Sequence, residues 1–152
     1  MVRPLRVRCR KEIYEGFKVA AIAAFPREKY GVLMGKRSGK RVWIKDIWIP
    51  DDQKRFASDR VLLADAVSTP SWRQEAEAIA DSEGLQVVGD IHSHCWRVRK
   101  FHERGREPSE TDWRNAPVPW VLGICTVSKS STEVWSSIAF WDSFPMADVE
   151  LF

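Results

Sequence analysis

The chain has 152 residues, of which 44% are hydrophobic and 30% charged, and its formal net charge is only +3. This length fits one domain spanning residues 1–152, with the composition of an ordinary soluble globular protein. No run of about 18 apolar residues and no apolar N-terminal segment occurs, so we expect neither a membrane span nor secretion. Three cysteines without a CxxC pattern fit a reduced, cytoplasmic location.

The first third of the sequence predicts a strand, a helix and a hairpin. Residues 5–10 alternate apolar and basic side chains, which is typical of an edge strand. Residues 11–25 carry apolar side chains at helical spacing and end at Pro26, so we expect an amphipathic helix packed on a sheet. Residues 30–34 and 41–50 then form two apolar runs around a Gly-containing turn, which predicts a hairpin.

The remainder predicts helices interspersed with strands. Residues 51–68 give no clear pattern. Gly84 is placed to end a helix at the position that favours glycine. The expected elements are a helix at 71–83, a strand at 86–91, a short helix at 109–115 and paired strands at 120–127 and 133–141. Such an alternation indicates a single α/β or α+β layer domain.

The candidate chemistry lies between the strand at 86–91 and the short helix after it. In an extended strand, residues two apart point the same way, so His92 and His94 share a face and Ser93 turns away. Two imidazoles and the carboxylate of Asp112 make three ligands, which leaves a tetrahedral zinc one open position for water. Asp90 lies on the histidine face, where it is either an acceptor for one imidazole or a plain strand-end residue.

Each piece also has a simpler interpretation. A lone His-x-His can be two hydrogen-bonded polar residues at a strand end. Ser109 and Asp112 suit a helix N-terminus, with Ser109 as the N-cap and Asp112 in the first turn. Cys95 could bind zinc as a thiolate, but its side chain is expected to face away from both histidines. The cap and the ligand interpretations are compatible, because a cap can fix the position of a ligand.

Two separated segments resemble a known family. His92-Ser93-His94 followed by Pro-Ser-Glu-Thr-Asp at 108–112 resembles the HSH…PSxTD signature of the JAMM (MPN+) zinc metalloproteases. The segment FPREKYGVLMG at 25–35 resembles their YPxExxGxLxG segment. The resemblance implies a single-domain MPN/JAB-type fold, with a mixed, curved β-sheet flanked by helices.

The resemblance also implies roles for individual residues. His92, His94 and Asp112 would bind one Zn²⁺ per chain, with water as the fourth ligand. Glu28 would be the general base and Ser109 would stabilise the oxyanion. The chain departs from the family where Cys95 replaces the usual proline and where residues 95–108 form a longer, Arg/Lys-rich segment. That segment is expected to border the substrate groove.

The resemblance implies a zinc isopeptidase or peptidase that cleaves after the C-terminal residue of a ubiquitin-like protein, releasing it from a target or processing its precursor. Some compact prokaryotic relatives serve beside activating (E1-like) and conjugating (E2-like) enzymes, in antiviral or ubiquitin-like conjugation operons, so such enzymes are possible partners. The alternative is a non-catalytic scaffold of the same fold. Nucleic acid is not an expected partner, because the net charge is small and the basic stretch short.

Overall fold

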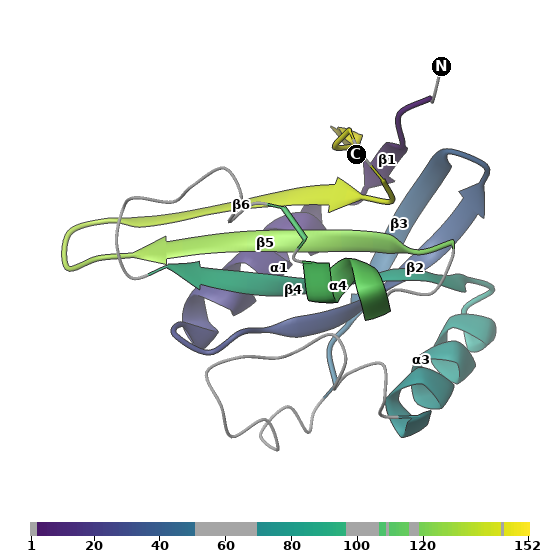
Figure 1. Ribbon diagram of the computed structural model, residues 1–152. Coiled ribbons are helices and arrows are strands. Elements are labelled where there is room, and N and C mark those ends of the chain that lie inside the picture. Colours follow the sequence, from purple (N-terminus) through teal and green to yellow (C-terminus); the bar gives the residue numbers. More distant parts are fainter. Residues whose placement is uncertain (1–2, 51–69, 97–106, 109, 116–118, 144) are drawn as a thin grey trace.

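The computed structural model describes residues 3–50, 70–96, 107–108, 110–115, 119–143 and 145–152 (Figure 1). No helix in these ranges is long and apolar enough to cross a membrane. In chain order the elements are β1 (Arg6–Cys9), α1 (Lys11–Ala24), β2 (Tyr30–Ser38), β3 (Arg41–Trp48), α3 (Pro70–Ser82), β4 (Gln86–Trp96), α4 (Glu110–Asn115), β5 (Val121–Lys129), β6 (Val134–Trp141) and β7 (Asp148–Leu151).

The strands form one mixed sheet of seven in the order β6-β5-β4-β2-β3-β1-β7. β2 runs antiparallel to β3 and β4, and β5 antiparallel to β6. β4 and β5 are parallel, as are the pairs that β1 makes with β3 and β7. Helices flank both faces, which confirms the predicted α+β single domain.

The prediction that residues 5–10 form an edge strand is wrong. β1 lies between β3 and β7, and its register partners include Val42 on one side and Val149 on the other. The outer strand β7 was not predicted, because Asp148–Leu151 is only four residues long and all four side chains are exposed. A strand that buries no side chain leaves no apolar pattern to recognise.

Helix α1 covers one face of the sheet and buries the stripe that the sequence predicted. Phe17 and Ala21 are buried against strand residues such as Leu33 and Phe140. Two of the three cysteines, Cys9 and Cys125, belong to the same core. Burial raises the pKa of the Cys9 thiol to about 12 and that of Cys125 to about 11, so neither forms a thiolate near neutral pH.

Helices α3 and α4 lie on the opposite face, as Figure 1 shows. Ala76 and Ala80 of α3 are buried, and the helix contacts β4 and β2. Gly84 follows the helix with a φ of +70°, the left-handed conformation expected of a helix-ending glycine. The predicted helix and the glycine at its end are therefore confirmed.

Strand β4 is longer than predicted and continues through both histidines to Trp96. Gly89 permits a close approach between β4 and β5, because a Cβ at this position would collide with the backbone of Val121. The same two residues are register partners at the start of the parallel pair. The glycine therefore helps to place the strand that carries the histidines.

Candidate metal centre

The two histidines lie in the middle of the sheet. His92 is paired with Tyr30 of β2 on one side and with Ile124 of β5 on the other. His92 is 2% exposed, whereas His94 is only partly buried. The imidazole of His92 is therefore the more deeply buried part of the site, and the imidazole of His94 is the part more accessible to solvent.

His92, His94 and Asp112 come together as a candidate metal-binding group, with one potential ligand atom from each within 4.8 Å of the others. The two Nε2 atoms are 3.0 Å apart, and Asp112 places Oδ1 3.4 Å from His92 Nε2 and Oδ2 3.6 Å from His94 Nε2. Metal–ligand bonds of about 2.0–2.1 Å in a tetrahedral zinc site separate neighbouring ligand atoms by roughly 3.3 Å. The three side chains are therefore spaced as zinc ligands would be.

Asp112 lies in the first turn of α4, as predicted, and is buried. A buried carboxylate needs compensating partners, and here the two imidazoles lie within ion-pair distance. Ser109 lies outside the described residues, as does most of the basic segment at 95–108. Neither the expected N-cap nor the expected oxyanion role of Ser109 is therefore addressed by the structure.

Glu28 precedes β2 in a half-buried segment that is bonded to the histidine strand. The Lys29 N–H donates to Ser93 Oγ at 2.7 Å, and the Ser93 N–H donates to the Lys29 carbonyl at 2.9 Å. Ser93, whose side chain was expected to turn away from the histidine face, thus contributes to the structure by bonding to the Lys29 backbone. These two hydrogen bonds fix the backbone of Lys29 against Ser93, which lies between the two histidines in the sequence. Glu28, the residue before Lys29, is therefore held close to the histidine strand.

Three acidic side chains near His92 affect the pKa of its imidazole. Burial alone would lower the pKa of His92, but hydrogen bonding and charge from Asp112, then the charges of Asp90 and Glu28, outweigh it. The net effect is a raised pKa. A site that attracts a proton to its imidazole through surrounding carboxylates also attracts a divalent cation.

Asp90, which the sequence placed on the histidine face, is a buried neighbour of the candidate metal group. It is fully buried, and the Tyr30 hydroxyl donates to its Oδ2 at 3.2 Å. Burial raises its pKa to about 7, with the Asp112 charge adding to the effect and His92, Trp120 and Tyr30 opposing it. Its hydrogen bond goes to Tyr30, so the structure does not show the imidazole contact considered from the sequence.

Cys95 is not part of the candidate metal group among the described residues. Its Sγ lies 3.5 Å from the carbonyl oxygen of Arg27, on the segment that leads to Glu28. Ser93 and Cys95, two residues apart on β4, thus both contact the backbone of this segment. Cys95, which stands where the family has a proline, thus makes a second contact between β4 and the segment that leads to Glu28.

Comparisons with known proteins agree with this geometry. The family model for prokaryotic homologs of the JAB domain matches residues 11–141. No curated protein matches the sequence. Among solved structures, a protein of Desulfitobacterium hafniense is 21% identical with a TM-score of 0.62, and the alignment covers 96% of this chain and 92% of that one.

Two further structures are similar in fold. A protein of Salinibacter ruber is 22% identical, with a TM-score of 0.53 over 91% of this chain and 82% of that one. A JAB1/MPN domain protein of Archaeoglobus fulgidus is 14% identical, with a TM-score of 0.53 over 99% of this chain and the whole of the other. At these identities the likeness concerns the fold alone.

Proposed function

Because the chain belongs to the prokaryotic homologs of the JAB domain, we propose that it is a zinc-dependent isopeptidase or peptidase. Its substrate would be the bond after the C-terminal residue of a ubiquitin-like protein, joined either to a target or to the rest of a precursor. The observation that carries the proposal is the convergence of His92, His94 and Asp112 at zinc-ligand spacing.

The donor set fits zinc chemically as well as geometrically. Two imidazoles and one carboxylate are a ligand combination of catalytic zinc sites, which keep one position for water or substrate. When bound, zinc supplies two effects there: it lowers the pKa of a coordinated water to about 7 and polarises the scissile carbonyl. No fourth protein ligand joins the group among the described residues, as a catalytic rather than a closed structural site requires.

Glu28 is the residue to which we assign proton transfer. Its charge acts on the buried His92, and its backbone is held against β4 by the Lys29–Ser93 hydrogen bonds. A carboxylate fixed beside the ligand group can accept a proton from the attacking water and return it to the leaving amine. By the family resemblance, Ser109 would donate a hydrogen bond to the developing oxyanion.

Membership of the family is what supports the proposed substrate class. We propose a ubiquitin-like protein or its conjugate as the partner, with activating and conjugating enzymes of the same pathway and a cytoplasmic site of action. An extended C-terminal tail could add to an exposed edge of the sheet and so bring its last carbonyl toward the ligand group.

Metal content tests the first half of the proposal. Wild-type protein dialysed against trace zinc should retain about one ion per chain, and His92→Ala and Asp112→Asn should each lose it. Glu28→Gln should retain the ion, because the proton carrier is not a ligand. Metal-free wild-type protein under these conditions would instead favour the non-catalytic scaffold.

Cleavage tests the second half. A conjugate of a ubiquitin-like protein with its target should be cleaved by zinc-loaded wild type and protected by chelator. Glu28→Gln should be slower by at least about 100-fold, within the range that general acid–base catalysis contributes. Equal cleavage by Glu28→Gln would overturn its assigned role, and intact conjugate with zinc-loaded wild type would overturn the proposed activity.

A further inference from the structure

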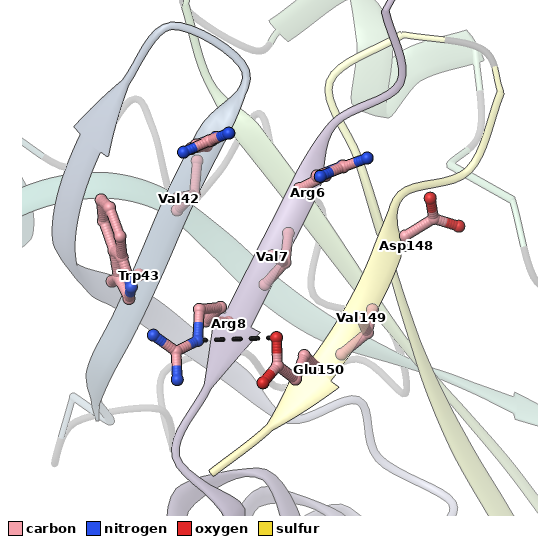
Figure 2. Close-up of a pocket in the computed structure, with 9 residues that line it drawn as sticks. Arg6, Val7, Arg8, Val42, Trp43, Asp148, Val149 and Glu150 are labelled. Atoms are coloured by element: carbon pink, nitrogen blue, oxygen red, sulfur yellow. Dashed lines mark ion pairs between the residues drawn. The ribbon is translucent and has the colours of Figure 1, made fainter.

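The sheet carries a second surface that the metal centre does not use. β1 turns Val7, and β3 turns Val42 and Ile44, toward the α1 core, so the alternate residues of these strands and their register partners on β7 point to the other face. Helix α3 contacts β4 and β2 on that face. On this face, which is turned away from α1, the strands β3, β1 and β7 form an open groove of about 480 Å³ (Figure 2).

We call this surface the arginine groove and define it by Arg6 and Arg8 of β1, Arg41 and Trp43 of β3, and Asp148 and Glu150 of β7. The strand register places the side chains in two cross-strand rows, and Figure 2 labels all of them except Arg41. One row is Trp43, Arg8 and Glu150, and the other is Arg41, Arg6 and Asp148.

Charge in the groove is uneven. Arg8 is already engaged, with its Nε 3.7 Å from Glu150 Oε2 and its guanidinium 5.1 Å from the ring of Phe152. Arg6 and Arg41 are directly opposed across β1 and β3, and among the described residues neither forms an ion pair with a carboxylate. Like charges on adjacent strands are destabilising, so this pair costs the fold energy that an anion in the groove would offset.

The cationic surface continues beyond the groove. Lys36 is the β2 register partner of Trp43 and extends that row on the same face. An adjoining hollow is lined by Arg3, Arg6, Lys40 and Arg41. Lys40 is engaged by Asp142, but the other cations named here still outnumber the two carboxylates of β7, and those carboxylates occupy one side only. Trp43, half-buried beside Arg8, adds an aromatic surface of the kind that anchors protein interfaces.

We propose that the arginine groove binds an acidic segment of a partner polypeptide. The excess of cations disfavours a second copy of this same face. The row of carboxylates along β7 would repel one side of a uniformly charged nucleic-acid backbone, whereas a polypeptide can present carboxylates to Arg6 and Arg41 and avoid them at β7. The proposal is independent of the metal centre and goes beyond the proposed activity.

The groove faces the same side of the sheet as the histidines. His92 is paired with Tyr30, which packs with Ala76 of α3 on that side, and β1 lies three strands from β4. Across the sheet, strands spaced about 4.8 Å apart place β1 roughly 14 Å from the histidine strand. Along β2, the partner of Trp43 (Lys36) lies six residues from the partner of His92 (Tyr30), which adds roughly 20 Å at about 3.3 Å per residue. The groove is therefore a separate site on the same face of the sheet as the metal centre.

Binding of a short acidic probe tests the proposal. Fluorescein-labelled Glu-Glu-Phe-Glu-Glu would be titrated with the full chain at about 50 mM salt and followed by fluorescence anisotropy. Its matched control peptide is Gln-Gln-Phe-Gln-Gln. The double variant Arg6→Gln/Arg41→Gln should weaken binding about tenfold or more, and Lys18→Gln/Lys129→Gln, which removes two charges elsewhere, should change it less than about twofold. Circular dichroism confirms that each variant is folded.

The outcomes separate the groove from its alternatives. Equal binding of the two peptides, or equal weakening by the two double variants, would overturn the proposal. A twelve-nucleotide thymidine strand that bound more tightly than the acidic peptide, and was lost in Arg6→Gln/Arg41→Gln, would identify a nucleic-acid surface instead. The His92→Ala variant should bind the peptide as wild type does, so failure of the proposed activity leaves this result unaffected.

Discussion

Ser93→Ala should show that the histidine strand and the Glu28 segment work as one unit. The change removes the buried oxygen that accepts the Lys29 N–H at 2.7 Å, and leaves the Ser93 N–H bond to the Lys29 carbonyl intact. An N–H left without its partner in a buried site costs about 2 kcal/mol. For a chain of this length that corresponds to a fall of about 6 °C in melting temperature.

The same change should reduce activity through Glu28 and leave metal binding alone. Loss of one anchor lets the neighbouring Glu28 move, and a displacement of about 1 Å in a catalytic group can cost about 100-fold in rate. His92 and His94 keep their places in β4, so zinc content should stay near one ion per chain. Urea unfolding of chelated protein measures the stability, and conjugate cleavage by the zinc-loaded form measures kcat.

The control is Ser82→Ala, which removes an exposed hydroxyl that bonds to the Ile79 carbonyl at the end of α3. It should change stability by less than about 0.5 kcal/mol and leave kcat unchanged. Wild-type stability and wild-type kcat in Ser93→Ala would refute the reasoning. A loss of stability with unchanged kcat would separate the structural role of the bond from any role in placing Glu28.

Three other expectations can be checked without substrate. Asp142 accepts hydrogen bonds from Arg37 and Lys40; although burial raises its pKa, these cations outweigh it and the net pKa is lowered. Asp142→Asn should therefore lower the free energy of unfolding by about 2 kcal/mol at neutral pH. The difference from wild type should shrink only when acid protonates the carboxylate, at a pH below its ordinary pKa of 3.8. A difference that does not change with pH in urea titrations would contradict this. Gly89→Ala should lower the free energy of unfolding in urea by about 3 kcal/mol, because the new Cβ meets the backbone of β5. Gly16→Ala, with nothing near its Cβ, should raise it by about 0.5–1 kcal/mol. Equal effects of the two changes would refute the packing argument. Ellman's reagent should titrate one thiol, Cys95, in the native protein and all three in urea, and rapid labelling of the two buried thiols would contradict their burial.

The sequence was informative where a local pattern determines the structure. The spacing of His92 and His94 on an apolar strand placed both rings on one face, and Gly84 marked the end of α3. Both depend on neighbours within a few residues. The family model, the fold of the similar structures and the approach of Asp112 to the histidines agree with what the two motifs implied.

Other features depended on contacts between distant segments. The Lys29–Ser93 bonds require β2 and β4 to be neighbours in one register, although β3 and α3 separate them in the chain. The complete burial of Asp90 follows from the same neighbours, and a strand-end aspartate gives no local sign of it. β7 was missed because backbone pairing to β1, and not a buried side chain, defines it.

The interior position of β1 has a consequence for the order of synthesis. β1 precedes β7 in the chain by well over a hundred residues, so it is synthesised long before the strand that pairs with its outer edge. Until β7 has been made and has paired, β1 exposes one row of unpaired N–H and C=O groups. Such an edge is a template for pairing with another chain. Charged side chains on an edge strand disfavour pairing with another chain, so Arg6 and Arg8 would act against pairing of this edge with a second copy of β1.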